Sequence, residues 1–132
     1  MSASISISLS NAVLFVCDPA WYSKERYRPM PEPSRAEVVT ANEFGMTICC
    51  RHEIDGPVAV SIGQGEPEDA SMVLQIERPL RTPSCIMAAS TVYDDAIVET
   101  KCRSPDSVVR VWLRNHANSD RVYIQVRDVP PV

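Results

Sequence analysis

The stretch SVVRVWLRNHANSDRVYIQVRD, residues 107–128, decides the fold class of this 132-residue chain. Apolar and polar residues alternate on both sides of the central NHANSD segment, which spans 115–120. Successive side chains of a strand point to opposite faces of a sheet, so this period of two predicts strands over 108–115 and 121–127. The turn-forming residues between them predict that the two strands pair as an antiparallel hairpin.

Short strands of the same character recur along the rest of the sequence. They are predicted over 2–10, 12–17, 45–53, 57–63, 71–77, 85–91 and 96–102. The separators carry turn residues, and the Asp55-Gly56 pair is typical of a tight hairpin between two strands. Helical spacing is absent, apart from one short helical turn predicted within 33–44. About eight or nine strands in this order indicate an all-β fold, a single antiparallel β-sandwich domain over residues 1–132.

A proline-rich segment over 18–36 interrupts the strands. It holds four of the eleven prolines of the chain, together with Trp21 and Tyr22. Proline fixes φ and donates no backbone hydrogen bond, so the segment is predicted to be one long loop. Its aromatic residues fit two interpretations, a partner-binding surface or a cap over one end of the sandwich. Residues 128–132 are predicted to fray beyond the last strand.

The composition is typical of a globular protein with a core, since 45% of the residues are hydrophobic and 23% are charged. The net charge of −4 argues against a protein that binds nucleic acid by neutralising phosphates. The five cysteines are an odd number without repeated spacing, which favours reduced thiols over a disulfide framework. The sequence predicts no signal peptide and no apolar run approaching the about 20 residues of a membrane span. We therefore expect a cytoplasmic protein that binds neither nucleic acid nor membranes.

Cys49 and Cys50, with His52 close behind, are the most obvious candidates for a metal-binding or reactive site. In a strand over 45–53, Cys50 and His52 share the apolar face, and Cys49 lies on the opposite, polar face. Adjacent strand residues diverge and cannot bind one tetrahedral ion, and the second half of a zinc ligand set is missing. The sequence therefore predicts no metal, no cofactor, no catalytic residues and no enzyme. The alternative that stays open is a redox-sensitive thiol at Cys49.

Charge is distributed unevenly along the chain. Residues 37–70 contain a single base, Arg51, and seven acids: Glu37, Glu43, Glu53, Asp55, Glu66, Glu68 and Asp69. The last thirty residues have a basic excess instead. They contain five arginines, Arg103, Arg110, Arg114, Arg121 and Arg127, and three acids, Asp106, Asp120 and Asp128. An acidic segment can attract a basic partner, unless folding spreads its charges around the domain. The turn acids Glu66, Glu68, Asp69, Asp94 and Asp95 fit either a functional patch or solvated turns.

Several short sequences, taken in order, resemble those of a known family. They are SISIS (4–8), AVLFV (12–16), FGMTICC (44–50), PVAVSI (57–62) and IERPL (76–80), followed by the closing strand pair. In this layout the chain resembles the competence protein J family of small β-sandwich proteins. The resemblance implies an inhibitor of a DNA-degrading nuclease or a related immunity protein. The acidic run at 64–69 and the proline and arginine of 18–36 depart from the family pattern, so no binding residue is carried over.

Together these observations predict a cytoplasmic inhibitor or immunity protein that neutralises a basic toxin or nuclease through an acidic surface. The predicted contact residues are Glu66, Glu68, Asp69, Asp94, Asp95, Trp21 and Tyr22. Two other classes fit the same fold. One is a structural or assembly protein, such as a phage or secretion-system component. The other is a carbohydrate- or lipid-binding module that exposes Trp21, Tyr22 or Trp112 as an aromatic platform.

Overall fold

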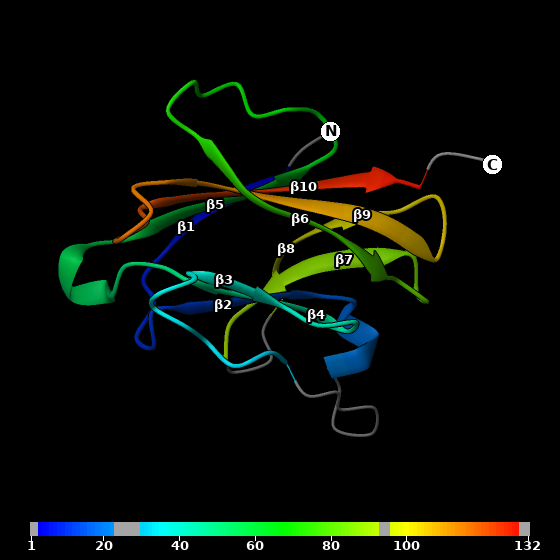
Figure 1. The fold of residues 1–132 in the computed structure, drawn as a ribbon, viewed down its shortest axis with the longest axis horizontal. Helices are drawn as coiled ribbons and strands as arrows, with labels where there is room; N and C mark the ends of the chain where they lie inside the picture. The colour runs from blue at the N-terminus through cyan, green and yellow to red at the C-terminus, as the bar shows by residue number, and fades with distance from the viewer. Residues whose placement is uncertain (1–2, 23–29, 93–95, 130–132) are drawn as a thin grey trace.

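A computed structural model of the protein describes residues 3–22, 30–92 and 96–129, and it contains two five-stranded sheets packed face to face (Figure 1). The first sheet has the spatial order β1 (Ala3–Ile7), β5 (Val58–Gly63), β10 (Arg121–Asp128), β9 (Asp106–Arg114) and β6 (Val73–Arg81). The second sheet has the order β3 (Val39–Ala41), β4 (Gly45–Cys49), β2 (Val13–Cys17), β7 (Ile86–Ser90) and β8 (Ala96–Lys101). Two 3₁₀ turns, η1 (Pro19–Tyr22) and η2 (Glu53–Asp55), lie between strands of the described chain.

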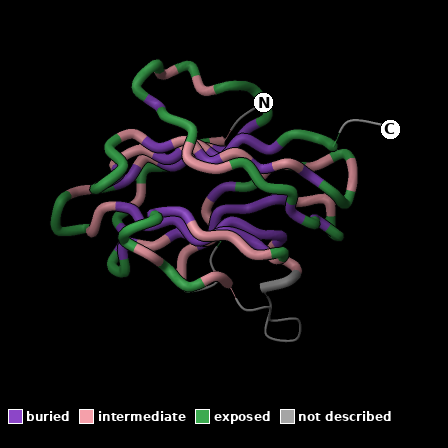
Figure 2. Tube along the Cα trace, viewed as in Figure 1, coloured by how far each residue is buried: buried purple, intermediate pink, exposed green. Residues whose placement is uncertain are grey.

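The predicted all-β sandwich is confirmed. Its paired strands are antiparallel except β5 and β10, which run parallel. The predicted hairpin of β9 and β10 forms, with Arg114 opposite Arg121. Its apolar residues point into a core that lies between the two sheets: Val109, Val111, Leu113, Val122, Ile124 and Val126 (Figure 2). Alternation therefore leaves the polar and aromatic residues of this hairpin on the outer face of the first sheet.

The Asp55-Gly56 pair does not form the predicted hairpin. The predicted strand over 45–53 ends at Cys49 in the second sheet, whereas β5 belongs to the first sheet. The chain between them therefore crosses from one sheet to the other and forms η2 on the way. Gly56 has the positive φ of a turn glycine, 119°, but it ends η2 by donating its N–H to Glu53 O. The Asp-Gly pair thus correctly predicted a positive φ at Gly56, but it wrongly predicted that the strands on either side pair with each other.

The strands also differ from the prediction in other places. β6 continues through Pro79 to Arg81, although the prolines of 78–84 predict a separator. Because β6 is an edge strand and pairs only with β9, a residue without an N–H is tolerated there. Within 33–44 a single helical turn is followed by the unpredicted strand β3. β10 also includes Asp128, the residue at which the frayed tail was predicted to begin.

Residues 30–38, which begin within the proline-rich segment and continue past its end, cover the outer face of the second sheet. Thr47 Oγ1 donates to Pro31 O at 2.6 Å, and Thr40 Oγ1, on the neighbouring strand β3, donates to Glu32 O at 2.8 Å. Every residue of β4 is consequently buried, and Cys49 is only 5% exposed. The prediction that Cys49 faces a polar surface is therefore wrong, because protein rather than water meets that side of the strand.

Cys50 and His52 also have separate structural roles. Burial raises the pKa of the Cys50 thiol, and the five cysteines are free. His52 precedes η2, where its Nδ1 accepts a hydrogen bond from Ile54 N–H at 3.1 Å. In the described ranges, His, Cys, Asp and Glu side chains nowhere gather in a group of three or more that could hold a metal ion. The described chain likewise has no helix that is long and apolar enough to cross a membrane.

Candidate partner-binding groove

Residues 64–72, here called the crossing segment, connect β5 to β6 over the outer face of the first sheet. In that sheet β10 and β9 lie between β5 and β6, so the connection has to pass across them. Figure 1 shows the segment arching over this face from the end of β5 to the start of β6. Three of the predicted contact residues, Glu66, Glu68 and Asp69, lie in it.

Side chains of β10 hold the crossing segment against the sheet. Tyr123 Oη donates to Gly65 O at 2.5 Å, and Gln125 Nε2 donates to the preceding carbonyl oxygen at 3.2 Å. Near the other end of the segment, Arg121 Nη1 donates to Asp69 Oδ2 at 2.8 Å. These three side chains stand at alternate positions of β10, so they share its outer face. The segment is thus fixed at both of its ends by one strand.

Asp69 is the centre of the network at one end of the segment. It accepts hydrogen bonds from the backbone and hydroxyl of Ser71, and Arg114 Nη1 lies 3.7 Å from its Oδ2. The bonds from Ser71, followed by the charges of Arg121 and Arg114, hold the pKa of Asp69 below its usual value. Arg114 Nη2 also lies 2.5 Å from Asp120 Oδ2, and this bond lowers the pKa of Asp120. Two arginines and two aspartates therefore compensate one another.

The basic excess of the last thirty residues is largely neutralised in the fold. Its ion pairs are Arg103 with Asp128, Arg110 with Glu77, Arg114 with Asp69 and Asp120, and Arg121 with Asp69. Glu66 and Glu68, by contrast, are exposed and have no ion-pair partner within 3–22, 30–92 and 96–129. The uncompensated charge of the crossing segment is therefore negative.

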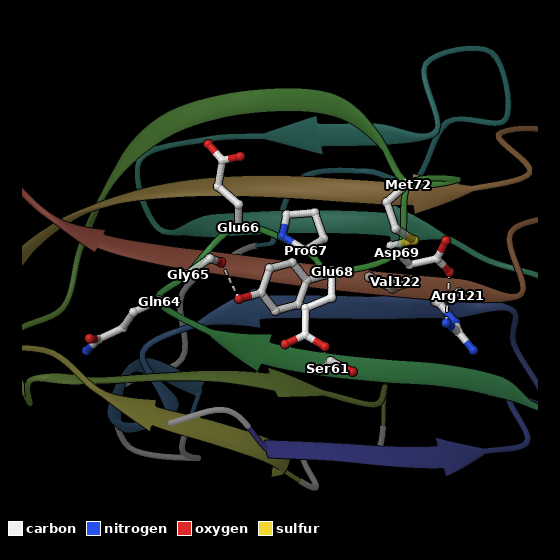
Figure 3. Close-up of a pocket in the computed structure, with 11 residues that line it drawn as sticks. Ser61, Gln64, Gly65, Glu66, Pro67, Glu68, Asp69, Met72, Arg121 and Val122 are labelled. Atoms are coloured by element: carbon white, nitrogen blue, oxygen red, sulfur yellow. Dashed lines mark hydrogen bonds and ion pairs between the residues drawn. The ribbon is translucent and has the colours of Figure 1, made fainter.

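A groove of about 450 Å³ lies between the crossing segment and the strands beneath it (Figure 3). Ser61 of β5 and Tyr123 of β10, which are opposite each other in the sheet, contribute from the strands. Glu66 and Glu68 contribute from the crossing segment, and their carboxylates point to opposite sides of the view in Figure 3. Burial raises the pKa of Tyr123, which keeps its hydroxyl a donor to Gly65. The lining offers carboxylates and hydrogen-bonding groups, and its volume suits a small ligand or a few side chains of a partner.

Four further residues were predicted as partner contacts: Asp94, Asp95, Trp21 and Tyr22. Asp94 and Asp95 lie outside the described residues. The backbone of Trp21 and Tyr22 belongs to η1, and their side chains lie outside the described part of the chain. Trp112 lies half-buried on the outer face of β9, where its Nε1 donates to Gln125 Oε1 at 3.1 Å.

The acidic run of residues 37–70 does not form one continuous patch. Glu43 lies in the turn between β3 and β4, and Glu53 and Asp55 lie in η2, which projects from one end of the sandwich, whereas the crossing segment arches over the outer face of the first sheet (Figure 1). For these residues the alternative expectation, that folding spreads the charges around the domain, is the right one. Of the acids in this run, only Glu66, Glu68 and Asp69 of the crossing segment line the groove.

The site residues contributed by β10 were missed in the sequence. Arg121, Tyr123 and Gln125 carry a signal only through the alternation of the hairpin, which puts them on one face. Their partners in the crossing segment are 52, 58 and 61 positions away along the chain. Contacts between residues so far apart in the chain leave no local pattern in the sequence.

Comparison with known proteins identifies the fold. Neither a family model nor a curated protein matches the sequence. Among solved structures, the crystal structure of ComJ from Bacillus subtilis, an inhibitor of the DNA-degrading activity of NucA, matches with a TM-score of 0.66. This chain has the fold of ComJ. The two proteins are 9% identical, and the match covers 98% of each chain.

A second similar structure, described as crocagin biosynthetic gene J, has a TM-score of 0.46, with 8% identity over 94% of each chain. The match to ComJ alone confirms, at the level of the fold, the resemblance to the competence protein J family that the sequence suggests.

Proposed function

We propose that this protein is a cytoplasmic inhibitor or immunity protein that binds a basic nuclease or toxin, with Glu66 and Glu68 as charged contacts. The observation that carries the proposal is a pair of exposed, uncompensated carboxylates beside a groove whose neighbouring arginines already have acidic partners. A basic protein surface meets opposite charge there without competition from nearby cations. Asp69 has a positioning role in this proposal, because Arg121 and Arg114 already compensate its charge.

The fold gives this proposal independent support. ComJ, which shares the fold over nearly the whole chain, inhibits the DNA-degrading activity of NucA. Proteins that bind DNA do so largely through basic residues that neutralise phosphates, so their clefts are positively charged. A negative groove is complementary to such a cleft and steers the two proteins together. The free thiols suit a reducing compartment.

The test begins with the protein that the wild-type chain binds in its native host, identified by mass spectrometry and then purified. We expect a basic protein whose nuclease or toxic activity falls when the chain is added. Neutralising the two groove acids, Glu66→Gln with Glu68→Gln, should weaken binding about tenfold to a hundredfold at low salt, because charge attraction is lost. The salt dependence of the dissociation constant should also decrease.

A matched control carries the same change of charge at exposed positions of the second sheet, Glu43→Gln with Glu99→Gln. We expect it to bind within about twofold of the wild type, because these acids are not at the groove. Equal weakening by the two double variants, or no weakening by either, would show that the groove is not the contact. An acidic partner, or one whose activity is unaffected, would also contradict the proposal. Asp94→Asn with Asp95→Asn, Trp21→Ala and Tyr22→Ala decide in the same assay whether these residues contribute.

A further inference from the structure

The turn η2 carries the most exposed large apolar side chain among the described residues. Ile54 is 86% exposed, compared with 60% for Val73 and about 40% for Ile5, Leu74 and Val129. Figure 1 shows η2 projecting from the left end of the sandwich in that view. Single exposed apolar residues are common on protein surfaces, so exposure alone gives no function to Ile54. Its surroundings give the reason to assign one.

The backbone on both sides of Ile54 is fixed by hydrogen bonds. Glu53 N–H donates to Leu9 O at 3.0 Å, and the N–H of Ile54 itself donates to the side chain of His52. Gly56 N–H closes the turn by donating to Glu53 O at 3.1 Å. Gly56 also has a φ of 119°, a conformation that L residues rarely adopt. Ile54 is therefore held outward by a turn that is formed before any partner arrives.

A second anchor comes from Arg51. Its Nε donates to Pro57 O at 2.8 Å, and its backbone N–H donates to Ser119 O at 3.0 Å in the turn between β9 and β10. Arg51 is thereby turned across the base of η2, where a Cβ on Gly56 would lie 2.9 Å from its Nη2. A turn braced in this way loses little conformational entropy on binding, which favours affinity.

Two acids flank the exposed isoleucine. Glu53 and Asp55 are both exposed, and the ion pairs of the described ranges include neither of them. A complementary partner surface has an apolar pocket with lysine or arginine at its rim. The pocket takes the isoleucine side chain, and the basic rim pairs with the carboxylates on each side of it. An acidic or a purely apolar surface would leave these charges unpaired at the contact.

We propose that η2 is a second docking element for the same basic protein partner, with Ile54 entering an apolar pocket and Glu53 and Asp55 meeting its basic rim. This inference rests on the proposed function, which supplies the basic partner. β5 separates η2 from the start of the crossing segment, but the segment returns along β10 until Asp69 contacts Arg121, which is opposite Ala59 near the start of β5. At about 3.3 Å per residue, the six residues of β5 therefore set an upper limit of about 20 Å, measured along the strand, on the separation of the two contacts. A partner with a standard interface of about 800 Å² spans that distance.

The test places a photo-crosslinking amino acid in the full chain, in its native host, at position 54, at position 68 in the crossing segment, or at position 73. We expect positions 54 and 68 to give an adduct with the same basic protein, and position 73, which is also exposed, to give none. An adduct at 68 without one at 54 leaves the proposed function standing and overturns this inference. An adduct of 54 with a second copy of this chain, or with an acidic protein, overturns it as well.

Further outcomes separate the two proposals. No adduct at 54 or 68 contradicts both of them, and an adduct at 54 alone contradicts the groove and supports η2. With the identified partner purified, Ile54→Ala should weaken binding about tenfold or more. The isoleucine side chain, which the proposed complex buries in the partner's pocket, is then replaced by a methyl group. Val73→Ala is the matched control, and its dissociation constant should stay within about twofold of the wild type. Equal weakening by the two variants would show general surface hydrophobicity in place of a defined contact.

Discussion

The two outer faces of the sandwich are covered by segments of very different character. Residues 30–38 lie on the second sheet through hydrogen bonds from threonine side chains to backbone carbonyl oxygens and through close packing at Gly45, and β4 beneath them is completely buried. The crossing segment lies on the first sheet through a few polar contacts and leaves a groove of about 450 Å³ beside it. One face is therefore closed by packed chain, and the other is polar and carries an open groove.

The difference follows from the residues on the two faces. On β4, Thr47 donates to the backbone of the covering segment, and the Met30 methyl group and the Val16 backbone oxygen occupy the space that a Cβ on Gly45 would need. On the first sheet, Arg121 and Tyr123 keep the crossing segment at the distance of long side chains. We therefore expect substitutions on the covered face to change global stability, and substitutions on the open face to change local structure and binding.

Replacement of Gly45 by alanine should have the largest effect on stability. An added Cβ would lie against the backbone oxygen of Val16 and 2.7 Å from Met30 Cε, and the backbone atom cannot move aside cheaply. We expect the free energy of unfolding, measured in urea, to fall by about 3 kcal/mol. Gly65→Ala in the crossing segment is the matched control, because its Cβ would meet nothing within 4 Å. Similar losses for both variants would refute the contrast between a tightly covered face and an open one.

Asp18 should rank second, because it ties the start of the proline-rich segment to the connection between β6 and β7. Its carboxylate is fully buried and accepts hydrogen bonds from Ala20 N–H, Ser84 N–H and Ser84 Oγ, at 2.9, 2.7 and 2.6 Å. Asp18→Ala removes the acceptor of all three bonds, including both bonds that join Asp18 to Ser84 across 66 positions of the chain. We expect a loss of about 2 kcal/mol in the free energy of unfolding by urea titration. Ser84→Ala removes a single hydroxyl donor and should lose clearly less, and an equal loss would assign the effect to that hydroxyl alone.

The contrast between the two faces also shows what the sequence could reveal. The hairpin of residues 107–128 was predictable because its alternation is local and both strands lie next to each other in the chain. Asp55-Gly56 was misread because a turn signal does not say in which sheet the following strand will pair. Burial of Cys49 was likewise invisible, since the covering segment has no alternation of its own. These failures all concern contacts between distant parts of the chain.

The candidate site divides in the same way. Glu66 and Glu68 could be named from the charge run of one turn sequence. Tyr123 and Arg121 could not, because a strand of the C-terminal hairpin meets a connection more than fifty residues earlier. The interpretation of Asp69 also changed. The sequence predicted it as a charged contact for a partner, whereas in the structure Arg114 and Arg121 compensate its charge.

The smallest effect on global stability is expected for Asp69, on the open face. Its pKa in the folded protein is below the usual 3.8, so its carboxylate stabilises the folded state above about pH 4 and this contribution is lost as the pH falls through the lowered value. Asp69→Asn should leave the urea midpoint at pH 7 nearly unchanged, because the ion pairs are partly exposed. Amide hydrogen-exchange protection in residues 64–72 should nevertheless decrease in the variant.

Acid provides the complementary measurement on the wild-type protein. Protection factors of residues 64–72 should fall below about pH 4 in the wild type, and this fall should be reduced in Asp69→Asn, which has no carboxylate at that position to protonate. Protection in β4, under the covering segment, should not change over the same range. Asp120→Asn is the control for the neighbouring carboxylate, whose pKa is also lowered. If β4 and the crossing segment lost protection together, the two faces would belong to one cooperative unit, and the groove could not rearrange around a partner independently of the core.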